Sequence, residues 1–154
     1  MEQLSFEEKM MRLALDEAQK AFEMGEVPIG AVVVRGNQVI ATAHNLRETE
    51  KSALCHAELL AIDRACKKLG GWRLHECDLY VTLEPCPMCA GAIINSRIKR
   101  VIFGAHDAKA GACGSCINLF ACDFNHHPIL YPGVLEKECA EILQAFFKKL
   151  RNKS

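Results

Sequence analysis

The fold class of this chain is decided by residues 78–96, which read Asp78-Leu-Tyr-Val-Thr-Leu-Glu-Pro-Cys-Pro-Met-Cys-Ala-Gly-Ala-Ile-Ile-Asn-Ser96. Residues 78–83 alternate as a strand does, and the strand pattern stops before Pro85. Residues 87–96 resemble a short helix with a proline in its first turn, where the missing N–H is tolerated. A strand that leads into a helix in this way favours an α/β domain.

Strands and helices continue to alternate on both sides of this unit. Ser5-Phe6-Glu7-Glu8 is a capping box that predicts a helix start, and helical apolar spacing then continues as far as Gly25. The other expected elements are strands at 31–34 and 38–43 around a tight hairpin at 35–37, a helix at 54–69, strands at 100–105 and 127–131, and a helix at 135–150. The predicted order, αββαβαββα, favours an α/β layered sheet with helices on both faces.

The composition fits one globular domain over residues 1–154, because half of the residues are hydrophobic and the length suits a single core. Nineteen basic residues balance nineteen acidic ones, so a nucleic-acid-binding role has to depend on local patches. No apolar stretch approaches the roughly 20 residues of a membrane helix, and a soluble protein is expected. Nine scattered cysteines and no leader-like start predict a reducing, cytoplasmic compartment.

Two cysteines and a histidine form the candidate metal site. Cys86-Pro87-Met88-Cys89 places two thiols on one face at the start of a predicted helix, where the helix dipole favours the thiolate form that binds zinc. This motif alone also fits a redox pair, half of a structural zinc site or two buried cysteines. His56 precedes it at the start of another predicted helix, and three protein ligands leave a fourth tetrahedral position open for water, as in catalytic zinc sites.

Glu58 is the candidate proton carrier of this site. Two thiolates and a neutral imidazole cancel the charge of the ion, so its water is less acidified than in a site of three histidines, and a nearby base becomes necessary. Glu58 follows His56 by two positions and is expected to take a proton from the water and pass it on to the substrate.

A structural zinc site is the alternative. It would combine Cys86 and Cys89 with Cys113 and Cys116, although the gap between the two pairs exceeds the roughly 15–20 residues of the common spacing. This interpretation predicts that zinc binding depends on Cys113 and Cys116 and not on His56.

Taken together, His56-Ala57-Glu58 and Pro85-Cys86-Pro87-Met88-Cys89 resemble the H-x-E and P-C-x-x-C signature of the zinc-dependent nucleobase deaminases. Nearly the whole chain is also similar to the bacterial tRNA-specific adenosine deaminases, which convert the wobble adenosine of an anticodon to inosine. The segments that carry this similarity are 27–34, 45, 56–58, 80–92, 96–98, 100–105, 107–109 and 111–112.

The resemblance implies a three-layer αβα sandwich around a mixed five-stranded sheet, as in cytidine deaminases. It also implies one catalytic Zn²⁺ per chain and a homodimer whose active sites are completed near the subunit interface. By the same resemblance, Asn45 hydrogen-bonds the flipped base, the segment from Ile29 to Ala31 lines the pocket, and Asp107 touches the nucleotide before the target. From the residues alone, Asn45 is better interpreted as a turn residue after a strand.

The last predicted helix adds a candidate contact with RNA. Phe146 and Phe147 are expected to offer one ring for stacking on an unpaired base, beside the basic residues Lys148, Lys149, Arg151 and Lys153. The alternative is a packed aromatic residue and a solvated tail.

The metal core does not select the substrate, because cytosine, cytidine and guanine deaminases share it. The segment 100–111 resembles the tRNA enzymes and favours deamination of a wobble adenosine in the tRNA anticodon loop. The first alternative is a deaminase of free nucleobases or nucleosides with the same fold. A more distant alternative is a zinc-stabilised RNA-binding module without turnover.

Overall fold

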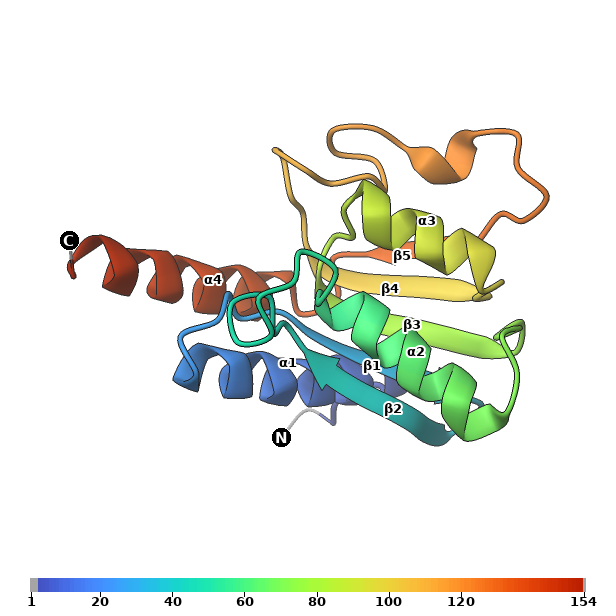
Figure 1. Ribbon diagram of the computed structural model, residues 1–154, viewed down its shortest axis with the longest axis horizontal. Coiled ribbons are helices and arrows are strands. Elements are labelled where there is room, and N and C mark those ends of the chain that lie inside the picture. The colour runs from blue at the N-terminus through green and yellow to red at the C-terminus, as the bar shows by residue number, and fades with distance from the viewer. Residues whose placement is uncertain (1–2, 154) are drawn as a thin grey trace.

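In the computed structural model, which describes residues 3–153, a five-stranded sheet lies between two layers of helices (Figure 1). The observed order of helices and strands is the predicted one, with one additional 3₁₀ turn. The elements are α1 (Phe6–Glu23), β1 (Gly30–Arg35), β2 (Gln38–His44), α2 (Ala57–Leu69), β3 (Cys77–Leu83), α3 (Pro87–Asn95), β4 (Arg100–Ala105), η1 (Leu119–Ala121), β5 (Ile129–Pro132) and α4 (Glu136–Arg151).

The sheet has the order β2-β1-β3-β4-β5 and mixes two kinds of pairing. β1 runs antiparallel to both β2 and β3, whereas β3, β4 and β5 run parallel to one another. The hairpin between β1 and β2 closes where Arg35 pairs with Gln38, and Gly36 adopts a φ of 61° in its turn. The expected mixed five-stranded sheet is confirmed.

Side chains of the central strands alternate between two cores, one on each face of the sheet. Val33 and Leu79 belong to a cluster with residues of α2 and α3, whereas Val32 and Tyr80 belong to a cluster with residues of α1 and α4. Figure 1 shows α2 and α3 in front of the sheet and α1 behind it. The prediction of helices on both faces is therefore confirmed.

The sequence patterns predicted some boundaries of the helices and strands correctly and others wrongly. The capping box of α1 is present, with the Ser5 hydroxyl accepting from the Glu8 amide at 3.1 Å. The predicted start of the second helix at residue 54 is wrong by three residues, because His56 has extended backbone angles and is the N-cap of α2. β5 likewise starts at Ile129, two residues after the predicted start. Among residues 3–153, no helix combines the length and apolar character needed to cross a membrane.

Candidate active site

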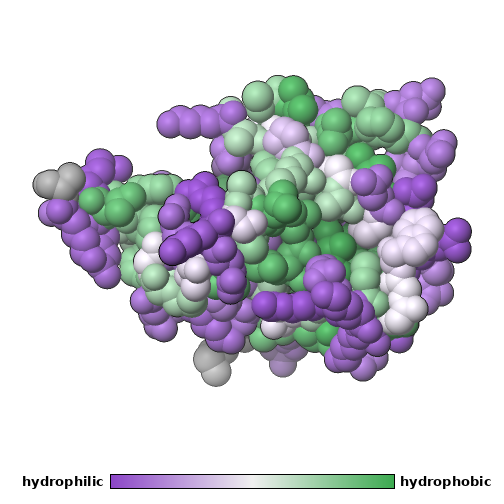
Figure 2. All heavy atoms as spheres, viewed as in Figure 1, coloured by the Kyte–Doolittle hydropathy of each residue, from purple (hydrophilic) through white to green (hydrophobic). Residues whose placement is uncertain are grey.

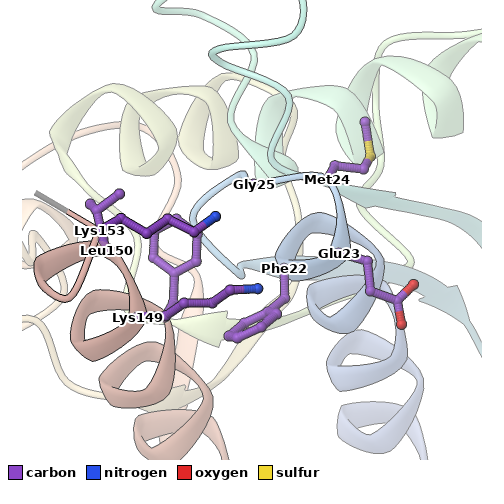
Figure 3. A pocket seen from close by; sticks show the side chains of 8 residues that line it. Phe22, Glu23, Met24, Gly25, Lys149, Leu150 and Lys153 are labelled. Atoms are coloured by element: carbon purple, nitrogen blue, oxygen red, sulfur yellow. The ribbon is translucent and has the colours of Figure 1, made fainter.

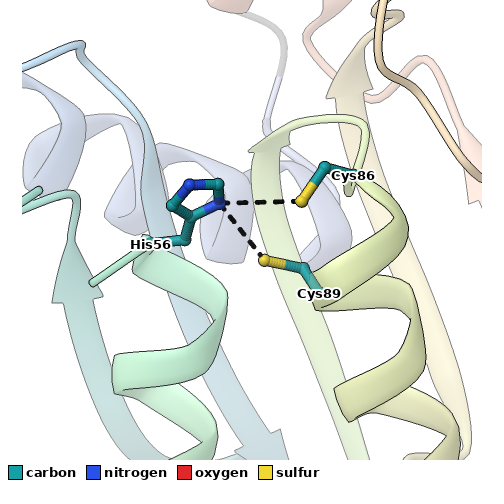
Figure 4. A group of neighbouring side chains, drawn as sticks. All are labelled: His56, Cys86 and Cys89. Atoms are coloured by element: carbon teal, nitrogen blue, oxygen red, sulfur yellow. Dashed lines mark hydrogen bonds between the residues drawn. The ribbon is translucent and has the colours of Figure 1, made fainter. Parts of the chain in front are cut away.

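The three expected metal ligands meet between the first turns of α2 and α3. Figure 4 shows the His56 imidazole, at the start of α2, pointing toward the sulfur atoms of Cys86 and Cys89 at the start of α3. Nδ1 of His56 lies 3.7 Å from Sγ of Cys86 and 3.5 Å from Sγ of Cys89. All three ligand atoms lie within 4.8 Å of one another.

These distances fit a tetrahedral zinc ion. Typical Zn–S and Zn–N bonds of about 2.3 and 2.0–2.1 Å at a tetrahedral angle separate the nitrogen and sulfur ligands by about 3.5–3.6 Å. The two measured distances, 3.7 and 3.5 Å, bracket that separation. One imidazole and two thiols are also a donor set that zinc prefers.

The start of each helix explains why these side chains are available as ligands. His56 and Cys86 are the N-cap residues of α2 and α3, and neither side chain makes a capping hydrogen bond with its own helix. Pro87 stands in the first turn of α3, as predicted. Contacts with Cys89 and His56 lower the pKa of the Cys86 thiol to about 4, whereas the hydrogen bond with Cys86 and burial raise the pKa of Cys89. The position of Cys86 beside His56 and Cys89 thus favours the thiolate form of this residue.

Glu58 lies in the first turn of α2, beside the three ligands. Its side chain is 4% exposed, and burial raises its pKa to about 7. Its neighbours include His56 and both cysteines, which all influence that pKa. A buried carboxyl beside the ligand group is able to carry a proton to and from a bound substrate.

A groove of about 600 Å³ opens at the same end of the sheet. Its walls come from the residues before β1, from the end of β3 three residues before Cys86, from the segments that follow β2 and β4, and from α4. The lining residues are Val27, Ile29, Arg47, Leu83, His106, Asp107, Ala108, Lys109, Ala110, Leu143 and Phe147. The groove combines apolar walls with a small number of charged side chains, as ligand sites commonly do.

The residues expected to contact the substrate lie in different surroundings in the structure. Ile29 and Asp107 line the groove. Asn45 is 4% exposed, and its Oδ1 accepts from the Arg47 amide at 3.2 Å while its Nδ2 donates to the Val27 carbonyl at 3.3 Å. These bonds give Asn45 the turn role that the residues alone favour. Ala31 is fully buried in the core cluster that faces α2 and α3, and it is not among the residues that line the groove.

The two adjacent phenylalanines of α4 face different surroundings. Phe146 is 7% exposed and packs edge-to-face on Phe22, with ring centroids 5.8 Å apart. It borders a separate cavity of about 300 Å³ between α1 and α4, where Figure 3 shows Phe22 and Lys149. Phe147 is 41% exposed and lines the groove instead. Of the two rings, Phe147 is thus the one that faces the groove.

The four-cysteine alternative is not supported by the geometry. Within residues 3–153, the group able to hold a metal consists of His56, Cys86 and Cys89. Cys113 is buried, which raises the pKa of its thiol to about 12, and Cys116 is exposed to solvent.

Two buried carboxylates near the groove were not anticipated from the sequence. Glu26 is 1% exposed and Glu84 is 2% exposed, and both accept hydrogen bonds from loop backbones. In the sequence, the one indication that Glu84 is special is its place as a single acidic residue between an apolar strand and Pro85. Glu26 follows Gly25 and had no comparable signal.

Comparisons with known proteins agree with this architecture. A family model described as MafB19-like deaminase matches residues 6–151. A protein of Bacillus subtilis (strain 168) named tRNA-specific adenosine deaminase is 56% identical over 148 residues, which cover 96% of this chain and 92% of that protein.

Solved structures show the same relationship. A structure from a study of A-to-I editing by tRNA:A34 deaminases at the wobble position of transfer RNA superposes with a TM-score of 0.85 at 48% identity, covering 88% of this chain and 99% of that one. A guanine deaminase from Bacillus subtilis gives a lower TM-score of 0.63 at 32% identity, covering 92% and 93%. The chain therefore belongs to the MafB19-like deaminase family and, within it, to the tRNA-specific adenosine deaminases.

Proposed function

We propose that this protein hydrolyses adenosine to inosine at the wobble position of a tRNA anticodon, with His56, Cys86 and Cys89 as zinc ligands. The observation that carries the proposal is the convergence of one imidazole and two thiols beside the buried carboxyl of Glu58. The similarity to proteins named tRNA-specific adenosine deaminase supports the choice of substrate.

With His56, Cys86 and Cys89 as its ligands, a zinc ion would supply a Lewis acid to activate water for attack at carbon 6 of adenine. The Glu58 carboxylate accepts the proton released by the attacking water. It passes this proton to the ring nitrogen next to carbon 6. It then takes the remaining proton from the new hydroxyl group at carbon 6 and gives it to the amino group, so that the C–N bond breaks, ammonia leaves and the carbonyl group of inosine remains. Because Glu58 is buried, bulk water does not compete for these protons.

The groove supports an RNA substrate despite the balanced net charge. Arg47 and Lys109 line it and offer cations to phosphates, while Phe147 offers an exposed ring to a base. Bases of an anticodon loop are already accessible, so turning one out costs less than extracting it from a duplex. Asp107 remains the proposed contact for the nucleotide before the target, and Asn45 the proposed contact for the target base.

One assay tests both the reaction and the substrate. The zinc-loaded protein is incubated with a tRNA that carries adenosine at the wobble position and, separately, with adenosine, guanine, cytosine and cytidine. We expect inosine in the tRNA and no ammonia from the free compounds. Ammonia from a free compound together with inert tRNA would instead identify a nucleobase or nucleoside deaminase.

Glu58→Gln is the matched control for catalysis. It keeps the size of the side chain but cannot carry a proton, so we expect zinc and RNA binding to persist while turnover falls by about 10²–10⁴-fold. Full turnover in this variant would overturn the proton-carrier role. A wild-type protein that binds zinc and tRNA without any turnover would favour an RNA-binding module.

We further propose that the protein is a homodimer that contacts its partner through the face formed by α2 and α3. Apolar residues gather on this face of the molecule in Figure 2. Leu54, just before α2, is 63% exposed, the highest value among the exposed large apolar side chains of residues 3–153. Large apolar patches commonly mark protein interfaces. Light scattering during gel filtration should give twice the 17.1 kDa mass of the chain, and a mass of one chain would refute the proposal.

We place the reaction in the cytoplasm, with one domain per chain. A reducing compartment keeps thiols from forming disulfides, and all nine cysteines are free thiols in the structure. Fractionation of cells should recover the protein with the cytoplasmic tRNA pool, and recovery from an oxidising compartment would contradict this placement.

A further inference from the structure

A buried carboxylate fixes the loop that follows β4. Oε1 of Glu84 accepts from the Asp107 amide at 3.0 Å, and Oε2 accepts from the amides of Cys113 and Ser115, both at 3.0 Å. The Ser115 hydroxyl donates to Oε1 as well. Burial raises the pKa of Glu84, but these hydrogen bonds outweigh it and hold the pKa below its ordinary value. The carboxylate thus joins both ends of the 107–115 segment.

The absence of a side chain at Gly111 strengthens this arrangement. A Cβ at that position would overlap the Glu84 carboxyl group and approach the Asp107 carbonyl oxygen to 2.5 Å. The Gly111 amide also donates to that carbonyl at 2.8 Å. The loop is therefore folded closely around Glu84, and its first residues, which include the half-buried Asp107 and the exposed Lys109, form one wall of the groove.

A second buried carboxylate fixes the opposite loop in the same way. Oε1 of Glu26 accepts from the Glu48 amide at 3.1 Å, and Oε2 accepts from the Thr49 amide and hydroxyl, both at 2.6 Å. This loop carries Arg47, which also lines the groove. Glu26 comes from the segment between α1 and β1, whereas the loop that it holds comes after β2.

Neither the metal chemistry nor the folding of the adjacent helix or strand explains why these two carboxylates are buried. Burying a carboxylate is costly unless several donors compensate it, and here the donors come from segments 22 to 31 residues away. Glu26 and Glu84 are not among the residues that line the groove or that form the metal group. Glu26 and Glu84 each hold in place one loop that contributes residues to the groove.

We propose that Glu26 and Glu84 are positioning residues that preorganise the two loops bordering the groove, and thereby set the affinity for the nucleotides that flank the target base. The inference depends on the proposed tRNA substrate for its second part only. A preordered loop does not lose conformational freedom when RNA binds, so releasing it weakens binding more than it slows the chemical step.

Glu84→Gln gives a specific test, because an amide retains only one acceptor oxygen. If the oxygen stays with the amides of Cys113 and Ser115, the new NH₂ group faces the Asp107 amide and leaves it without an acceptor. We expect NMR hydrogen exchange at Asp107 to accelerate by about tenfold or more, while Cys113 and Ser115 remain protected.

Glu26→Gln is the matched control on the other loop. Its oxygen is expected to stay with Thr49, where it serves two donors, so that the Glu48 amide loses its acceptor. Exchange should accelerate at Glu48 and not at Asp107, and the reverse should hold for Glu84→Gln. Amides of β1 and β3 serve as the reference for global stability in both variants.

Steady-state kinetics with the tRNA substrate then tests the functional part. For each variant, we expect KM to rise about tenfold or more while kcat changes less than threefold and zinc content stays the same. Exchange that accelerates equally in β1 and β3 would indicate a general loss of stability and overturn the proposal. Unchanged exchange in both loops would also overturn it, as would a fall in kcat with KM unchanged.

The two proposals fail in different ways. If the wild-type protein is inactive on tRNA but the loops respond as described, the proposed substrate is wrong and the anchoring of the loops stands. If the wild type deaminates tRNA and neither variant changes exchange or KM, the positioning role is wrong and the proposed function stands.

Discussion

Gly30, the first residue of β1, packs directly against the backbone of α1. A Cβ built at Gly30 would lie 2.7 Å from the Ala18 amide nitrogen and 2.9 Å from the Ala14 carbonyl carbon, with the Ala14 carbonyl oxygen closer still. Ordinary contacts begin at 3.4 Å. All three atoms belong to the helix backbone and cannot rotate away, so Gly30→Ala requires α1 to retreat from the sheet by about 0.7 Å or more.

The cost of that movement follows from the side chains that α1 buries. Met11 and Leu15 of α1 are 0% and 8% exposed, and burying such a side chain stabilises the protein by about 1.5–3 kcal/mol. A gap of about 0.5–1 Å forfeits a quarter to a half of the dispersion energy at a contact. With the strain of the remaining overlap, we expect Gly30→Ala to reduce the free energy of unfolding by about 3 kcal/mol.

The assay is thermal unfolding of the zinc-loaded variant at a fixed zinc concentration, because bound metal shifts Tm. For a domain of this size, about 3 kcal/mol corresponds to a decrease in Tm of about 6–12 °C. Gly71→Ala is the matched control, since a Cβ there meets no atom within 4 Å, and its Tm should change by no more than about 2 °C. Equal Tm values for Gly30→Ala and Gly71→Ala would refute the packing argument.

Three further predictions concern the metal, the pH response and the groove. Cys86→Ser should lose zinc by elemental analysis while Cys116→Ser keeps it, and the opposite pattern would restore the four-cysteine site. Hydrogen bonds from Thr49 and Glu48 outweigh burial and hold the pKa of Glu26 below 4.5, so its stabilisation is complete above that pH and is lost as the pH falls through the lower folded pKa. Glu26→Gln should therefore lose less stability than the wild type in urea titrations between about pH 6 and pH 3, and parallel curves would contradict this. Gly111→Ala should raise KM for tRNA by about tenfold or more, and an unchanged KM would argue against a fixed loop.

The sequence predicted those parts of the fold that depend on local patterns. The capping box at Ser5, the strand 100–105 and the proline-started α3 all have their signals within a few residues, and the structure contains all three. Boundaries failed where a local pattern continued past the true end, as in the residues before His56. There the extended backbone of His56 makes this residue the N-cap, so the helix begins only at Ala57, and apolar periodicity does not report backbone angles.

Sequence motifs predicted the candidate metal ligands and Glu58, but they did not predict the buried carboxylates that hold the loops beside the groove. His56, Glu58, Cys86 and Cys89 were predicted from two sequence motifs, and the structure brings the three candidate ligands together between the first turns of α2 and α3, with Glu58 beside them. Their roles in catalysis stay predictions until they are tested.

By itself, the sequence determined the α/β class and the order of the elements, because these follow from short-range periodicity, and it singled out the candidate metal ligands by residue chemistry. Only the tertiary structure decided that Phe147 and not Phe146 faces the groove, that the side-chain amide of Asn45 supports a turn, and that Glu26 and Glu84 secure two distant loops. A helix rotates successive residues by about 100°, so which of two adjacent rings is exposed depends on how the helix is seated against its neighbours. Likewise, the hydrogen bonds of a buried carboxylate come from segments that meet it only after the chain has folded.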